Sequence, residues 1–198
     1  MLELWLIRHG KTAGNMLGRY IGTTDEPLCP EGRNALSKAC YPAPEAVFAS
    51  PMKRTVETAG ILFPELPVHS IEDLAECDFG EFENKNYKEL EGNLRYQAWI
   101  DSGGNLPFPG GESREAFQKR SLRGFERAVN QCLREEIHRA ALVVHGGTIM
   151  NIMERFALQK RSFYDWHVSN GGGYGLDLDV YQWRKGRRCL KVTERAEP

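Results

Sequence analysis

Residues 4–10 read Leu-Trp-Leu-Ile-Arg-His-Gly, an apolar run that stops at a cation, an imidazole and a glycine. A short apolar run of this kind is typical of a strand buried inside a sheet. Polar groups at the tip of a buried strand cost free energy unless something there uses them. A second apolar run ends in the same way at residues 143–147, Val-Val-His-Gly-Gly. Ligands of open parallel sheets bind beyond the carboxyl ends of the strands, so parallel neighbours would bring His9 and His145 together there.

Strand and helix signals alternate along the rest of the chain, which predicts an α/β fold. Strands are expected at 2–7, 46–49, 67–71 and 141–145, followed by a closing hairpin of 174–183 and 189–194 around a turn at 184–187. Helices are expected at 30–40, at 50–63 with Ser50 as N-cap, and at 87–100, 113–139 and 148–158. Gly- and Pro-rich residues 101–111 indicate a loop. We expect one domain over 1–198, a three-layer sandwich with a mostly parallel central sheet and helices on both faces.

The composition is that of an ordinary globular protein, with 198 residues, 41% hydrophobic and 27% charged residues, and a net charge of −1. This charge balance gives no sign of nucleic-acid binding. The five cysteines are scattered and form no Cys-x-x-Cys pair, which favours free thiols in a reducing compartment. The first apolar run is too short for a signal peptide, and no stretch approaches the ~20 apolar residues of a membrane span. We therefore expect a cytoplasmic protein with no membrane partner.

Further candidates follow the other strands. A helix that begins after residues 46–49 can direct Arg54 back over the carboxyl edge of the sheet, where Arg8 and His9 lie. The segment after residue 71 can bring Glu76 to the same edge. Paired guanidinium groups bind the oxygens of a phosphate bidentately. Nearby cations lower the pKa of an imidazole, so the ring stays neutral and can accept a phosphoryl group. A protonated carboxyl group supplies a proton for the leaving oxygen, and the carboxylate that results then activates water.

Five motifs together resemble the histidine phosphatase superfamily, the group that includes cofactor-dependent phosphoglycerate mutases and α-ribazole phosphatases. They occur in the family's order and are Leu6–Asn15, Gly22–Gly32, Ser50–Ala59, Leu74–Glu83 and Val143–Gly147. The tripeptide Arg-His-Gly alone is a weak signal, whereas five motifs spread over most of the chain are specific. One departure is Phe82-Glu83-Asn84, because the short phosphatases of the family carry Trp-Glu-Gly there.

The resemblance implies a role for each matching residue. His9 forms the phosphohistidine, Glu76 is the acid and base, and Arg8, Arg54 and His145 hold the phosphoryl group. The same comparison adds three residues to phosphate or substrate binding, namely Thr12, Asn15 and Gly146. It also implies that residues 79–112 form a helical and loop cover over the carboxyl edge.

The activity implied is that of a metal-independent acid-type phosphatase without a cofactor, acting on a small phosphomonoester. The resemblance to α-ribazole phosphatases suggests α-ribazole 5′-phosphate, an intermediate of cobalamin biosynthesis. The cover is rich in aromatic residues and poor in Lys and Arg, which favours a ring-bearing or apolar alcohol over phosphoglycerate. The segment between Glu76 and His145 is shorter than in the mutases, and a shorter cover over the site favours hydrolysis. The oligomeric state is left open, with a homodimer as one option.

Several alternatives remain open. Asp78 rivals Glu76 as the acid, while His69, His138 and His167 are assigned to the surface or to local structure. Glycines 171–173 and the basic residues 184–188 are interpreted as turns. The function could instead be that of a mutase-type phosphoryl transferase, a broad-specificity sugar or nucleotide phosphatase, or a binding module without turnover. A metal enzyme with His9, His145 and Glu76 as ligands is disfavoured, because the adjacent arginines would repel a dication.

Overall fold

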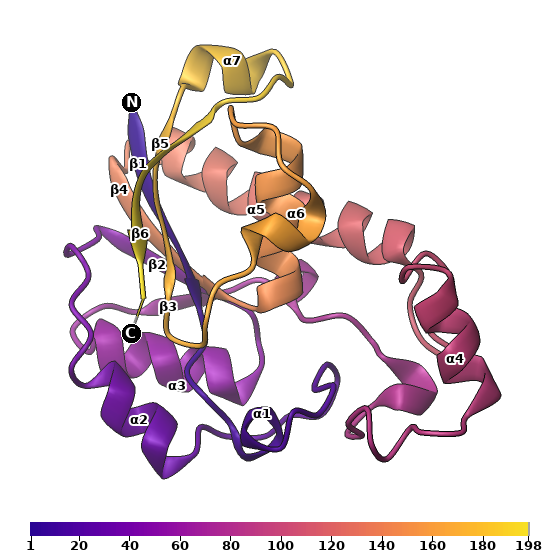
Figure 1. Cartoon of the computed structure of the whole chain (residues 1–198). Coiled ribbons are helices and arrows are strands. Elements are labelled where there is room, and N and C mark those ends of the chain that lie inside the picture. Colours follow the sequence, from indigo (N-terminus) through magenta and orange to yellow (C-terminus); the bar gives the residue numbers. More distant parts are fainter. Residues whose placement is uncertain (198) are drawn as a thin grey trace.

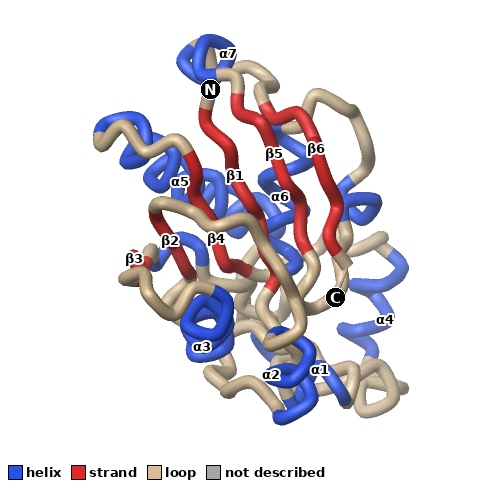
Figure 2. Tube along the Cα trace, turned by 90° about the vertical axis from the view of Figure 1, so that its left-hand side faces the viewer, coloured by secondary structure: helices blue, strands red, loops and turns tan. Residues whose placement is uncertain are grey.

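The computed structural model describes residues 1–197 and contains a six-stranded sheet in the order β3-β2-β4-β1-β5-β6. The strands are β1 (Leu2–Arg8), β2 (Ala46–Ala49), β3 (Val68–Ser70), β4 (Arg139–Val144), β5 (Gly173–Leu178) and β6 (Leu190–Ala196). The pairs β1–β4, β4–β2 and β2–β3 are parallel, whereas β5 runs antiparallel to both β1 and β6. Figure 2 shows the strands side by side. The α/β prediction with a mostly parallel sheet is thus confirmed.

The principal helices lie on both faces of this sheet (Figure 1). The α-helices are α1 (Ala13–Met16), α2 (Pro30–Leu36), α3 (Lys53–Leu62), α4 (Leu94–Asp101), α5 (Arg114–Arg134), α6 (Gly146–Phe156) and α7 (Val180–Arg184). Alternate residues of β1 face opposite layers, as the pleat of a strand requires. Leu2, Leu4 and Leu6 pack in the core formed with α5 and α6, whereas Ile7 packs in the smaller core formed with α3.

The register of β1 and β4 positions the site. Arg8 pairs with Val144, so the residues that follow them leave the sheet side by side at its carboxyl edge. The His9 N–H donates to the Val144 carbonyl at 3.0 Å and extends the pairing by one step. The β2 strand lies on the other side of β4 and ends at the same edge, where α3 begins four residues later.

The largest differences between predicted and observed helices lie at the end of α5 and at the start of α4, and the helix expected at 30–40 also ends early, at Leu36. The helix expected at 113–139 ends at Arg134, because Glu136 adopts a left-handed conformation with φ of 55° and the chain turns into β4. The helix expected at 87–100 begins only at Leu94, since Asn93 Oδ1 accepts hydrogen bonds from the N–H groups of Arg95 and Tyr96 and caps it there.

The closing pair of antiparallel strands was predicted correctly, but the helix between the two strands was not predicted. The strand expected to continue to Trp183 ends at Leu178, α7 takes the place of its last residues, and the predicted turn follows α7 at residues 185–187. Asp179 causes this change, because its carboxylate accepts the N–H groups of Tyr181 and Gln182 at 2.9 and 3.1 Å.

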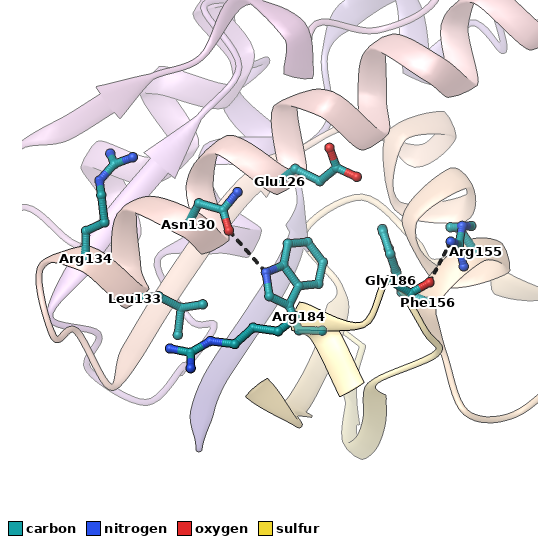
Figure 3. A pocket seen from close by; sticks show the side chains of 9 residues that line it. Glu126, Asn130, Leu133, Arg134, Arg155, Phe156, Arg184 and Gly186 are labelled. Carbon is teal, nitrogen blue, oxygen red and sulfur yellow. Dashed lines mark hydrogen bonds between the residues drawn. The ribbon is translucent and has the colours of Figure 1, made fainter. Parts of the chain in front are cut away.

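A surface hollow lies where α7 meets α5 and α6 (Figure 3). The Trp183 indole N–H donates to Asn130 Oδ1 at 3.1 Å, and Arg155 donates to the Gly186 carbonyl at 2.9 Å. The hollow is at the amino end of β1 and β4, the end of the sheet opposite His9 and His145. Among the described residues, no helix combines the length with the apolar content that a membrane crossing demands. All five cysteines are free thiols.

Candidate active site

The two histidines meet at the carboxyl edge of the sheet. The ring centroids of His9 and His145 lie 5.2 Å apart in an edge-to-face arrangement, as expected from the parallel pairing of their strands. His9 is 3% exposed and His145 is fully buried. Burial lowers the pKa of both rings well below the ordinary value, and the charges of Arg54 and Arg8 lower them further. Both imidazoles are therefore neutral near pH 7.

A single hydrogen bond fixes the tautomer of His9. Its Nδ1 lies 2.7 Å from the carbonyl oxygen of Gly10, which can only accept a hydrogen bond. Nδ1 therefore carries the proton, and the lone pair of the neutral ring lies on Nε2. A neutral imidazole with a free Nε2 is a nucleophile, and the backbone contact holds its plane in place.

Arg54 is fully buried, and within residues 1–197 its side-chain hydrogen bonds all go to backbone carbonyls. Its Nη1 donates to the carbonyl of Thr24 at 2.8 Å, and its Nη2 donates to those of Gly22 and Ile21 at 2.8 and 3.4 Å. The residue occupies the first turn of α3, which begins at Lys53. Ser50, the expected N-cap, is replaced in that position by Met52. Ser50 instead brings its Oγ to 2.8 Å from Nε2 of His145.

Arg8 lies at the end of β1 and contacts the segment before β5. Its Nη1 donates to the carbonyl of Val168 at 2.8 Å and lies 3.2 Å from Nε2 of His167. Within residues 1–197, neither Arg8 nor Arg54 forms an ion pair with a carboxylate. The Nε atoms of both arginines are buried without a hydrogen-bond partner in this part of the chain. Two cations with unused donors beside neutral imidazoles form a suitable site for a phosphate dianion.

Glu76 is the acidic group of this site. Its Oε1 accepts the N–H of Cys77 at 2.9 Å, and its Oε2 accepts the N–H of Gly147 in the first turn of α6 at 3.3 Å. Burial raises the pKa of this carboxyl and outweighs these donors and the two arginines, which lower it. A carboxyl with a raised pKa can hold a proton for a leaving group and can later act as a base.

The backbone around Glu76 is fastened by an ion pair from α5. Arg120 donates to both carboxylate oxygens of Glu112 at 2.9 and 2.7 Å, and to the carbonyl oxygens of Asp73, Ala75 and Glu76 at 2.9–3.2 Å. Asp78, the rival acid, instead uses Oδ1 to accept the N–H of Gly80 at 2.8 Å. This contact stabilises a local turn, and the geometry therefore favours Glu76 over Asp78.

The three remaining candidates lie near the site in supporting positions. Thr12 and Asn15 form a reciprocal capping box at the start of α1, where each side chain accepts the other's backbone N–H. The Oδ1 of Asn15 also accepts from Asn170, whose Nδ2 reaches the carbonyl of His9. Gly146 is the first residue of α6, and a Cβ placed there would lie 3.4 Å from Cζ and Nε of Arg8. These contacts tie Thr12 and Asn15 to local structure and place Gly146 against the Arg8 guanidinium.

The sequence reasoning missed four residues that support the site. Ser50 was read only as a cap, His167 was assigned to the surface, and Asn170 and Glu83 were given no role. Glu83 accepts the N–H groups of Gly22 and Thr24 at 2.7 and 2.9 Å, and so fastens the loop whose carbonyls hold Arg54. Glu83 lies in a motif quoted above, but only the tertiary structure shows what its carboxylate binds.

The metal alternative gains no geometric support. Within residues 1–197, His, Cys, Asp and Glu side chains form no group of three or more that is close enough to hold a metal ion. His9 and His145 do lie together, but the charges of Arg8 and Arg54 act on both of them. A site that already holds two guanidinium groups attracts an anion rather than a dication.

Comparison with known proteins gives a consistent result. The model of the histidine phosphatase superfamily (branch 1) matches residues 4–189. An adenosylcobalamin/α-ribazole phosphatase of Salmonella typhimurium is 28% identical over 89% of this chain and 91% of its own length. A 2,3-bisphosphoglycerate-dependent phosphoglycerate mutase of Gloeobacter violaceus is 34% identical over 77% of this chain and 74% of its own length. The crystal structure of the α-ribazole phosphatase from Shigella flexneri superposes with a TM-score of 0.80 and 26% identity, covering 100% of this chain and 98% of that one.

Proposed function

Because the chain belongs to branch 1 of the histidine phosphatase superfamily, we propose that it hydrolyses phosphomonoesters through a phosphohistidine on His9. One observation carries the proposal. The neutral His9 ring has its Nδ1 proton bound to the Gly10 carbonyl, which leaves Nε2 free, and the positive charges of Arg54 and Arg8, which form no ion pair with a carboxylate within residues 1–197, act on the ring. This arrangement supports nucleophilic attack on a dianionic phosphoryl group.

The first half of the reaction forms the covalent intermediate. His9 Nε2 attacks phosphorus, and the bond from phosphorus to the ester oxygen breaks. Glu76 in its protonated form donates its proton to that oxygen, and the alcohol leaves. Arg8, Arg54 and His145 hold the phosphoryl oxygens, and the backbone of Gly146 lies against the Arg8 guanidinium. The raised pKa of Glu76 supports the role of proton donor.

The second half returns the enzyme to its starting state. Glu76, now a carboxylate, takes a proton from a water molecule, and the resulting hydroxide attacks the phosphohistidine. The bond from His9 Nε2 to phosphorus breaks, and inorganic phosphate leaves. No metal or cofactor enters this scheme. Asp78 stays the alternative acid for the same two steps.

The substrate class follows from the cover, which we propose to be residues 79–112. Its rings pack largely on one another, since Phe82 lies 5.3 Å from Tyr96, and Trp99 lies 5.0 Å from Phe108, between ring centroids. Phe79 and Trp99 also meet Tyr20, which follows α1. Phe79, Trp99 and Tyr20 keep partial exposure, and Tyr20 stands two residues before the Gly22 carbonyl that binds Arg54. An aromatic wall here favours a ring-bearing alcohol, and α-ribazole 5′-phosphate is the substrate we propose.

The mechanism is tested by brief exposure to substrate followed by quenching. His9 should carry a phosphate that is labile in acid and stable in base, and His9→Ala should carry none. An acid-stable adduct on another residue would overturn the scheme.

The substrate is tested on a panel of phosphomonoesters with His9→Ala as the blank. We expect higher kcat/KM for α-ribazole 5′-phosphate and nucleoside monophosphates than for 3-phosphoglycerate. The 34% identity to a phosphoglycerate mutase keeps one second candidate in view. Preference for 3-phosphoglycerate, or transfer between its 3- and 2-positions, would establish that candidate instead.

A further inference from the structure

His167 contacts the guanidinium of Arg8 in a way that fixes its own protonation. Nη1 of Arg8 lies 3.2 Å from Nε2 of His167 and 2.8 Å from the carbonyl oxygen of Val168. An arginine has donors only, so Nε2 of His167 must accept. His167 is therefore a neutral ring whose proton lies on Nδ1. The residue itself is exposed, whereas Val168 is fully buried.

These two acceptors use both hydrogens of Nη1 and leave the opposite side of the guanidinium free. The Nε atom of Arg8 is buried without a partner among the described residues. The Nε–H and Nη2–H bonds of a guanidinium are parallel and bind two oxygens of a phosphate together. On the side of α6 this edge meets residue 146, which is a glycine, and a Cβ there would lie 3.4 Å from Arg8 Nε.

We propose that His167 is a positioning residue for Arg8. It holds one nitrogen of the guanidinium so that the Nε–Nη2 edge faces the phosphoryl group. The inference rests on the proposed function, since it assigns Arg8 to phosphoryl binding. It goes beyond that function because His167 lies outside the five motifs of the sequence analysis, and the proposed mechanism gives it no role.

The surroundings of His167 favour the neutral ring that this role needs. Desolvation of the ring by its neighbours lowers the pKa of His167, although the residue keeps exposed surface, and the positive charges of Arg8 and Arg195 lower it further, while Glu197 acts in the opposite direction. Arg195, on β6, donates through Nη2 to the carbonyl of His167 at 3.3 Å and through Nε to Glu197 at 2.8 Å. Arg8 and Arg195 thus approach His167 from two different strands.

Two substitutions separate the hydrogen bond from the bulk of the ring. His167→Phe keeps a ring and removes the acceptor, while His167→Gln restores an acceptor without a ring. A hydrogen bond at an exposed site to a charged group predicts a roughly three- to tenfold loss of affinity on its removal. We expect His167→Phe to raise KM for p-nitrophenyl phosphate by that factor with kcat changed less than about twofold, and His167→Gln to restore KM.

Calorimetric titration with sulfate tests the same contact without turnover. Sulfate is a dianion of phosphate-like shape, and His167→Phe should bind it roughly three- to tenfold more weakly than the wild type. In an Arg8→Lys background the same substitution should have no further effect, because His167 acts through Arg8. Should sulfate follow this pattern while no phosphomonoester is hydrolysed, the proposed function fails and the role of His167 stands.

A spectroscopic measurement completes the test. The ¹⁵N chemical shifts of the His167 ring should show an unprotonated Nε2 that accepts a hydrogen bond, and this signature should disappear in Arg8→Lys. The proposal is overturned if Nε2 carries the proton, or if the wild type binds no sulfate. It is also overturned if His167→Phe matches the wild type, or if His167→Gln is as weak as His167→Phe.

Discussion

The backbone N–H of Gly147 donates to Oε2 of Glu76 at 3.3 Å, which links the start of α6 to the acidic residue of the site. This approach depends on the absence of a side chain at position 147. A Cβ placed there would lie 2.6 Å from Oε1 of Glu76 and 2.8 Å from the ring of Phe117. The second glycine of the His-Gly-Gly motif therefore makes room for the carboxyl group.

Gly147→Ala should move the Glu76 carboxyl and lower kcat by roughly tenfold or more, because a misplaced proton donor loses much of the usual general-acid contribution. Gly60→Ala in α3 is the matched control, since nothing lies within 4 Å of a Cβ at that position. The control should keep full activity and gain about 0.5–1 kcal/mol of stability. Steady-state kinetics and thermal unfolding of both variants check the expectation. Equal activity of the two variants would contradict the role of position 147.

Glu76→Gln should slow turnover of alkyl phosphates by roughly 10²–10⁴-fold, the usual range for a general acid and base. The loss should be smaller for p-nitrophenyl phosphate, because p-nitrophenolate leaves without a proton. Asp78→Asn is the control and should change kcat little, since Asp78 serves a local turn. Rates for a series of leaving groups measure the effect. An equal loss for all leaving groups would point to a binding role, and a larger loss in Asp78→Asn would make Asp78 the acid.

The buried histidines make stability depend on pH. The pKa values of His9 and His145 in the folded protein lie well below 6.5, so the unfolded chain binds more protons as the pH falls below about 6.5. The free energy of unfolding should therefore fall on acidification, by up to about 1.4 kcal/mol per pH unit for each histidine. Denaturant unfolding between pH 7 and 5 measures the slope, and His9→Gln or His145→Gln should flatten it. A slope unchanged by either substitution would show that the rings are not the source.

Glu76 contributes to the pH dependence of the free energy of unfolding with the opposite sign to the two histidines. Its pKa is raised in the folded protein, so the folded state binds the extra proton as the pH falls through that raised value. Its protonation adds stability and offsets part of the histidine loss. Glu76→Gln should therefore steepen the acid slope rather than flatten it.

At position 84, substitution by glycine should leave the stability of the protein unchanged, whereas substitution by alanine should lower it. Its φ is 56°, in the left-handed region that glycine and asparagine adopt most readily. Asn84→Ala should cost about 1 kcal/mol, while Asn84→Gly should change stability little. Glu136, with φ of 55°, is the comparison position, and Glu136→Gly should stabilise the protein. Denaturant midpoints of the three variants test this. A stable Asn84→Ala would mean that the backbone there relaxes freely.

The same observation explains the departure from the family's Trp-Glu-Gly motif. Asn84 takes the conformation that the family's glycine would accommodate without strain, so the neighbouring Glu83 can still bind the loop at Gly22 and Thr24.

The convergence of the site could be predicted because it depends on strand ends. Two apolar strands that each end in His-Gly put their histidines at one edge once they are parallel neighbours, and pairing of Arg8 with Val144 does this. The partners of these residues could not be predicted in the same way. The His167 contact joins residues 159 positions apart through an irregular segment that carries no periodic signal.

The ends of helices and strands were predicted less well where a single residue ends or begins an element against the hydrophobic pattern of the sequence. Residues 174–183 have the composition of a strand, but the Asp179 carboxylate caps a helix instead. The end of α5 has neither glycine nor proline to mark it, and Glu136 makes the turn in their place.

Arg54 is anchored by peptide oxygens, and every residue type carries one. Mutations of the side chains at positions 23 and 24 can therefore accumulate without loosening the guanidinium, provided that the backbone keeps its path. Position 22 is the exception, because a Cβ there would lie 1.8 Å from the carbonyl oxygen of Cys77. A design that transfers this anion site to another scaffold must therefore reproduce the backbone conformation of the loop rather than its amino-acid sequence.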